Sequence, residues 1–262
     1  MPGISSMLPM GGEAIWGDLE GAPDDLPGQE HTFGSFLNFR SGNWTTPAKN
    51  FTVEDAMAYL FNTTEDWYQN QVKTSYSQGV AHTAAEVEAN EKSPQKWINP
   101  LETRLPLAPS LKIYCFYGVG KPTERAYYYR RPDPFSLTTL NITIDTSLTE
   151  ADIDHGVIMG EGDGTVNLMS TAYMCNKGWN IKRFNPAAVK VTVVEMPHEP
   201  DRFNPRGGPN TADHVDILGR QNLNELILQV AAGRGDTIQD YVVSNIREYA
   251  ERSKVYEENE RK

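Results

Sequence analysis

The chain has 262 residues, of which 39% are hydrophobic, so it can bury the core of one large domain or two modest ones. Its 24 Lys and Arg residues are scattered and outnumbered by 35 Asp and Glu residues, and the net charge of -11 excludes nucleic acid as a partner. No window holds the roughly 20 continuous apolar residues of a membrane span, and the first residues lack the basic start and apolar run of a signal peptide.

Residues 1–105 are irregular, with Gly, Pro, Asn and Trp between short helical patterns. We predict a helix starting at Thr52, because Thr52 and Asp55 resemble a capping box and apolar residues then recur on one face. The segment TTEDWYQN, 63–70, repeats the start signal, and an Ala- and Glu-rich helix in 81–95 is expected to stop at Pro94. We interpret this region as a surface helical insertion.

From Leu105 onward the pattern changes to short strands separated by turn residues. The predicted strands are 111–119, 125–131, 141–147, 155–160 and 189–196. Several are apolar on successive positions, which is typical of strands covered on both faces of a sheet. The first ends in GVGKP, which lacks the spacing of a dinucleotide-binding loop and is interpreted as a turn.

Two helices are predicted in the last part of the chain. Apolar residues recur at helical spacing over 220–232, and Gly233 suits the end of that helix. His214 therefore lies in a loop between a strand and a helix. A final helix is expected from 241 onward, fraying into a charged tail.

An acid and a histidine follow strands in an order that suggests catalysis. Asp163 lies in GEGDGTVN after an apolar strand, and His214 lies in TADHVDILG after the last strand. Active sites of open α/β sheets form at the carboxyl ends of strands, and acid before histidine is the order that α/β-hydrolases use after their serine. We predict that the Asp163 carboxylate orients the His214 imidazole.

Four segments carry a resemblance to a known family. They are SMLPMGGEAIWGD at 6–18, YCFYGVGKPTERAYYYR at 114–130, GEGDGTVNLMSTAYMC at 160–175 and ADHVDILGRQNLNELILQVAAGRGD at 212–236. Together they resemble the lecithin:cholesterol acyltransferase-like family, and most closely its phospholipid:diacylglycerol acyltransferase branch. The resemblance extends over nearly the whole chain.

The resemblance implies an α/β fold, namely the carboxyl-terminal half of an α/β-hydrolase with part of a helical cap. Residues 1–105 would be the partial cap, 106–255 the carboxyl-terminal half of the core, and 256–262 a charged tail. It makes Asp163 the triad acid and His214 the general base. Asp213 and Asp216 match neither role, and we interpret them as local carboxylates of the loop and the helix start. Four other histidines match no catalytic position of the family: His31, His82, His155 and His198.

The sequence departs from the family at the nucleophile. The family's serine lies upstream in a GxSxG elbow, and this sequence contains no GxSxG. We therefore expect the nucleophile to belong to a missing amino-terminal half, and we expect this chain alone to be inactive. A truncated gene, a split gene and a degenerate copy remain alternatives.

The resemblance implies acyl transfer from a phospholipid to diacylglycerol at a membrane surface, forming triacylglycerol. It implies no cofactor and no metal, and the sequence has no HExxH or CxxC spacing. Tryptophans and other aromatics of the cap could cover such a site, although ordinary packing also explains them. The alternatives are a sterol O-acyltransferase or a phospholipase of the same family, or a non-catalytic lipid-binding remnant.

Four sequons, at Asn43, Asn50, Asn62 and Asn141, favour the lumenal side of the endoplasmic reticulum, with any membrane anchor outside this chain. Composition does not decide whether the two cysteines form a disulfide or remain two buried thiols. In the plasma members of the family, cysteines at matching positions are joined. The resemblance therefore implies a Cys115–Cys175 disulfide.

Overall fold

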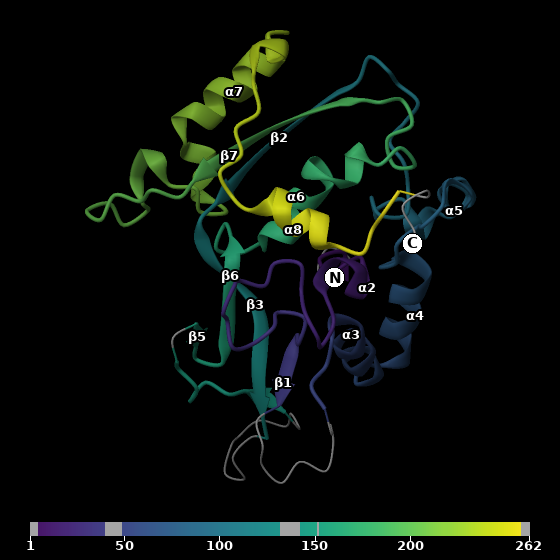
Figure 1. Ribbon diagram of the computed structural model, residues 1–262, viewed down its shortest axis with the longest axis vertical. Helices are drawn as coiled ribbons and strands as arrows, with labels where there is room; N and C mark the ends of the chain where they lie inside the picture. Colours follow the sequence, from purple (N-terminus) through teal and green to yellow (C-terminus); the bar gives the residue numbers. More distant parts are fainter. Residues whose placement is uncertain (1–4, 40–48, 132–141, 151, 258–262) are drawn as a thin grey trace.

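The computed structural model describes residues 5–39, 49–131, 142–150 and 152–257, which form a mixed α/β fold with two sheets (Figure 1). A five-stranded sheet contains β1 (Leu37–Phe39), β3 (Lys121–Arg130), β4 (Thr143–Ile144), β5 (Ile153–Asp154) and β6 (Val157–Gly162). The other sheet pairs β2 (Lys112–Val119) with β7 (Lys190–Pro197) in parallel. The predicted α/β class is confirmed.

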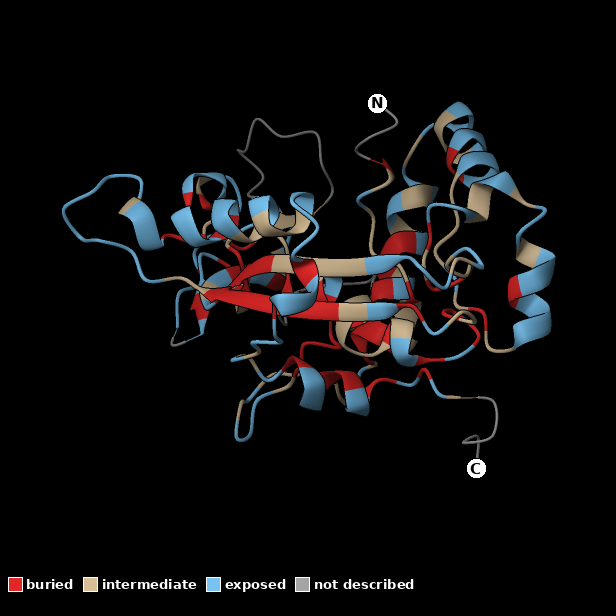
Figure 2. Ribbon diagram, turned by 90° about the horizontal axis from the view of Figure 1, so that it is seen from above, coloured by how far each residue is buried: buried red, intermediate tan, exposed pale blue. Residues whose placement is uncertain are grey.

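Both faces of the β2–β7 sheet are covered by helices. Helices α6 (Leu168–Asn176) and α8 (Ile246–Arg252) lie on one face, and α7 (Gln221–Ala231) lies on the other, as Figures 1 and 2 show. Successive side chains of β2 and β7 therefore point to opposite faces of the sheet. Tyr117 and Val193 join the main core with α6 and α8, whereas Phe116 and Met196 pack with Leu223 of α7. This double coverage explains the continuous apolar runs of both strands.

The amino-terminal part supplies four helices to the described structure: α2 (Gly12–Trp16), α3 (Val53–Asn62), α4 (Asp66–Ser75) and α5 (Ala84–Asn90). The predicted start of α3 is confirmed, because the Thr52 side chain accepts a hydrogen bond from the Asp55 amide. The predicted threonine cap of α4 is wrong, since Glu65 occupies that position. Thr63 and Thr64 instead donate their hydroxyls to carbonyls in the last turn of α3.

Short 3-10 turns connect the larger elements. They are η1 (Pro94–Lys96), η2 (Gly178–Asn180), η3 (Gly208–Asn210), η4 (Asp216–Gly219) and η5 (Gly235–Thr237). The predicted stop of α7 is confirmed, with Gly233 in the left-handed region at φ 73°.

The last helix starts later than the sequence predicts. Residues 241–244 run beside β7, where the Tyr241 amide donates to the Val193 carbonyl and the Glu195 amide donates to the Tyr241 carbonyl. The buried Glu195 carboxylate also accepts bonds from the amides of Val243 and Ser244, both at 2.7 Å. These tertiary bonds hold the segment extended, so α8 begins only at Ile246.

The predicted disulfide between Cys115 of β2 and Cys175 of α6 is confirmed, with the two Cα atoms 6.4 Å apart. It links a strand of the parallel sheet to the helix that packs against it. Of the sequons, Asn43 and Asn141 lie outside the described residues, as do Trp44 and the end of the predicted tail, 258–262.

Removing this disulfide should lower the free energy of unfolding. The bridge joins cysteines separated by 60 residues, and loop-closure entropy then contributes about 4 kcal/mol. Denaturant unfolding with and without reductant measures the effect. The double variant Cys115→Ala/Cys175→Ala is the control and should not respond to reductant. Equal stability of the oxidised and reduced wild type would contradict the prediction.

Candidate active site

A single-residue turn brings Asp163 to the carboxyl end of β2. Gly120, at φ +84°, is the only residue between β2 and β3, and β3 then pairs antiparallel with β6 from Lys121 opposite Gly162. Asp163 follows β6 directly. Asp163 and His214 both follow strands, but the two strands belong to different sheets. The strand before Asp163 belongs to the five-stranded sheet, and the turn at Gly120 brings the two sheets together.

The turn after β6 fixes the Asp163 carboxylate. Its Oδ1 accepts hydrogen bonds from the amides of Thr165 at 3.0 Å and Val166 at 2.8 Å. The Gly164 amide donates to the Thr123 hydroxyl of β3 at 2.8 Å, which ties the turn to the neighbouring strand. Asp163 is buried, and its second oxygen, Oδ2, is left for another partner.

That partner is His214, which the structure brings into contact with Asp163. The His214 Nδ1 lies 2.8 Å from Asp163 Oδ2, and the His214 amide donates to the Asp163 carbonyl at 3.0 Å. A carboxylate can only accept, so Nδ1 carries the hydrogen and Nε2 is the basic nitrogen of the neutral ring. The His214 side chain is 42% exposed, and within the described residues no hydrogen bond occupies Nε2.

Sequence reasoning missed Lys121, whose ammonium forms an ion pair with Asp213. The hydrogen bond from Lys121 holds the pKa of the Asp213 carboxyl below its usual value. Because Lys121 also pairs through its backbone with Asp163, it connects the acid turn to the histidine loop. A lysine directly after a strand-end turn was the available signal in the sequence.

Asp213 and Asp216 each pair with a cation of their own. Asp213 pairs with Lys121, and Asp216, at the start of η4, lies 4.0 Å from Arg206. The His214 ring is bonded to Asp163 and not to either of these carboxylates.

The other histidines have other partners. His198 accepts a hydrogen bond from the Ala212 amide through Nδ1 at 3.1 Å, and burial lowers its pKa. His31 makes an edge contact with Tyr128, and His155 pairs with Asp154 at 2.5 Å on the surface. His82 donates its backbone amide to Glu86.

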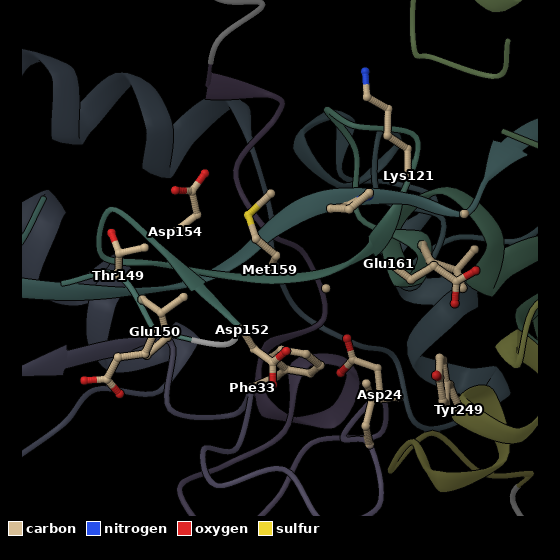
Figure 3. Close-up of a pocket in the computed structure, with 16 residues that line it drawn as sticks. Asp24, Phe33, Lys121, Thr149, Glu150, Asp152, Asp154, Met159, Glu161 and Tyr249 are labelled. Carbon is tan, nitrogen blue, oxygen red and sulfur yellow. The ribbon is translucent and has the colours of Figure 1, made fainter. Parts of the chain in front are cut away.

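Figure 3 shows a cavity of about 710 Å³ beside the five-stranded sheet, lined by apolar residues and several carboxylates. Neither Asp163 nor His214 lines it. Lys121 reaches its edge, but in Figure 3 its side chain points away from Asp24 and Asp152. Burial, and then the nearby Glu195, raise the pKa of Glu161 in this wall. The cavity thus ends short of the acid–histidine pair, while Lys121 in its lining pairs through its backbone with Asp163.

A metal centre is not formed by the residues that the structure describes, since they contain no group of three or more His, Cys, Asp or Glu side chains placed to hold an ion. The chemistry available at the pair is proton transfer. A buried carboxylate orients an exposed imidazole, which is the arrangement that activates a nucleophilic hydroxyl.

The chain belongs to the lecithin:cholesterol acyltransferase family, whose sequence profile matches residues 1–221. The match includes both Asp163 and His214.

Within that family the chain is similar to two fungal phospholipid:diacylglycerol acyltransferases. It is 44% identical to the one from Schizosaccharomyces pombe over 95% of this chain and 38% of the relative. It is 42% identical to the one from Saccharomyces cerevisiae over 94% of this chain and 36% of the relative. Phospholipid:diacylglycerol acyltransferase 1 of Arabidopsis thaliana is 42% identical over 68% of this chain and 27% of its own length. The chain thus spans less than two fifths of these relatives.

Replacing Gly162 with alanine should destabilise the acid turn. A methyl group there would collide with the Val166 carbonyl oxygen and crowd the Thr123 side chain, whereas nothing lies within 4 Å of a methyl group at Gly219. Gly162→Ala should therefore lower the free energy of unfolding by about 1–3 kcal/mol. The matched Gly219→Ala change should stay within about 0.5 kcal/mol. Chemical denaturation measures the free energy of unfolding of both variants. Equal losses for Gly162→Ala and Gly219→Ala would contradict the close packing of the turn around Gly162.

Proposed function

We propose that Asp163 and His214 are the acid and base of an acyl-transfer triad that moves a fatty acyl group from a phospholipid to diacylglycerol. The observation that carries the proposal is the 2.8 Å contact between His214 Nδ1 and Asp163 Oδ2, with Nε2 left accessible. The relatives' names supply the substrate classes, phospholipid and diacylglycerol. The buried acid holds the ring in the tautomer that can accept a proton.

The reaction proceeds in two steps. As a serine oxygen attacks the acyl carbonyl, Nε2 of His214 takes the serine proton and then passes it to the departing alcohol of the lysophospholipid. The diacylglycerol hydroxyl next gives its proton to Nε2 and attacks the acyl-enzyme, forming triacylglycerol. The same proton returns to the serine oxygen. Asp163 stabilises the imidazolium that exists in both steps.

The serine is proposed to come from a segment of the complete enzyme that precedes residues 1–262. The sequence has no GxSxG elbow, and the chain spans 38% of the Schizosaccharomyces pombe relative. The sheet supports this proposal. In the described residues β7 is the only strand that pairs with β2, yet parallel sheets rarely consist of two strands. A further strand beside β2 would complete the sheet and end next to His214.

The complete enzyme is proposed to work on the lumenal side of the endoplasmic reticulum, against a membrane surface. The Cys115–Cys175 disulfide supports an oxidising compartment. In the described part of the chain, no helix has the length and apolarity that a bilayer crossing needs.

Substitutions in the complete enzyme test the assignment of acid and base. Asp163→Asn and His214→Ala should each lower kcat by about 10³-fold or more, because each breaks the unit that deprotonates the serine. Asp213→Asn and Asp216→Asn should lose far less, since both carboxylates pair with other cations. The measurement is transfer of a labelled acyl group from phospholipid to diacylglycerol.

Residues 1–262 expressed alone serve as the control and should show no turnover. Turnover by this chain alone would reject the proposal that the nucleophile lies outside it. If Asp216→Asn were as inactive as Asp163→Asn, the choice of triad acid would be wrong. Transfer to a sterol or to water instead of diacylglycerol would identify a different acyl acceptor.

Glycosylation tests the lumenal location. Asn62 is exposed at the end of α3, whereas the Asn50 amide is partly buried and bonded to Asn38 and to the Phe39 amide. In cells that make the complete enzyme, Asn62→Gln should therefore remove one glycosidase-sensitive increment of mass, and the matched Asn50→Gln should remove none. No glycosidase-sensitive mass on the wild type would argue against the lumen.

A further inference from the structure

The loop that follows β7 carries the most exposed large apolar side chain of the described residues. Phe203 is 96% exposed. The chain between β7 and η4 extends away from the body of the molecule, on the left of both Figure 1 and Figure 2. An aromatic side chain this exposed has its apolar area available for another phase or partner.

Hydrogen bonds within the loop determine the position of Phe203. The Asp201 amide donates to the Gly207 carbonyl at 2.8 Å, and the Gly207 amide donates to the Asn204 carbonyl at 2.9 Å. The Phe203 amide donates to Asp201 Oδ1 at 3.0 Å. Gly207 takes a left-handed conformation at φ +77°, which suits glycine. The tip is therefore an ordered turn that presents Phe203 outward.

The base of the loop is fixed to the histidine side of the site. Arg220, buried at the start of α7, donates through Nη1 to the Pro197 carbonyl at 2.7 Å and to the Asn210 carbonyl at 3.0 Å. One guanidinium thus binds both stems of the loop. Residues 211–213 then lead directly to His214, so the orientation of the loop is coupled to the orientation of the catalytic face.

Other exposed apolar side chains follow His214 in the chain. Val215 and Leu218 are exposed in and beside η4, and Ile227 and Leu228 are exposed on α7. These four residues and Phe203 are here called the apolar rim. Because η4 packs against α7, the rim belongs to one structural unit with the His214 loop.

Two arginines close to Phe203 suit a phosphate-bearing surface. Arg202 and Arg206 offset Glu199 and Asp201, so the loop 199–210 has no net charge in a chain whose net charge is -11. Arg206 is largely exposed and pairs with Asp216 at 4.0 Å, and in the described structure no carboxylate pairs with Arg202. An aromatic residue between two arginines suits the boundary of a bilayer, where the ring enters the acyl region and the guanidinium groups meet lipid phosphates.

We propose that the loop 199–210 binds the surface of a phospholipid bilayer, with Phe203 inserted, and so directs the apolar rim and His214 toward the membrane. The choice of a bilayer as the occupant rests on the proposed function, since phospholipid and diacylglycerol are bilayer components. The loop contributes no group to proton transfer, so its role is to bring the site to its substrates.

Vesicle binding by residues 1–262 tests the proposal without any catalytic step. The protein is sedimented with vesicles of phosphatidylcholine, with and without phosphatidylserine. Phe203→Ser should lower the partition coefficient about tenfold or more, because the burial of one phenyl ring is lost. The control Leu107→Ser removes another exposed apolar side chain, which precedes β2 at the opposite end of the sheet, and should leave binding unchanged.

The arginines give a second, independent readout. Arg202→Gln and Arg206→Gln should each weaken binding about fivefold on vesicles that contain phosphatidylserine and much less on phosphatidylcholine alone. Wild type that binds neither vesicle, or Phe203→Ser that binds as wild type does, would overturn the proposal. If wild type bound neither vesicle, a polypeptide segment and not a bilayer would be the partner that covers the apolar rim. His214→Ala should bind vesicles normally, so failure here is separable from failure of the proposed reaction.

Discussion

The antiparallel register between β3 and β6 is the constraint on which the site depends. With Lys121 opposite Gly162, the residue after β6 lies beside the carboxyl end of β2, where the His214 loop also passes. A slip of one residue would turn the side chain of every β6 residue to the other face of the sheet. Gly162 helps to hold the register, because its missing side chain admits the Val166 carbonyl and the Thr123 side chain. Close packing of backbone therefore fixes the position of Asp163 relative to His214.

Two buried charged groups join segments that are distant in the chain. Arg125 of β3 forms a buried pair with Asp24 and also donates to the Phe33 and Trp16 carbonyls. Glu195 of β7 holds the segment before α8 in the same way, through backbone amides. Arg125 is paired with Asp24, and removing Asp24 would leave an uncompensated buried charge, which costs several kcal/mol. Residues 16–33 and 243–244 are thus fixed to β3 and β7, respectively.

Much of the fold could be predicted from sequence because local signals agree with it. Thr52 and Gly233 mark helix ends through bonds and dihedral angles that depend only on neighbours. The order of acid and histidine also sufficed to predict their pairing. The start of α8 could not be predicted, because the residues before it are held extended by Glu195, almost 50 positions earlier. Lys121 was missed for the same reason, since its partner Asp213 is distant in sequence and near only after β3 pairs with β6.

The acid–base pair is complete within this chain, and what it leaves open lies at one end of the β2–β7 sheet. All bonds that fix the Asp163 carboxylate come from its own turn and from His214, so the pair requires no further segment to form. Within the described residues, no hydrogen bond occupies Nε2 of His214 and no strand other than β7 pairs with β2. A strand added parallel to β2 would end at the carboxyl edge where His214 lies, because parallel strands end together. In the proposed function, a serine in the turn after such a strand would face Nε2, so one pairing event would complete both the sheet and the proposed triad.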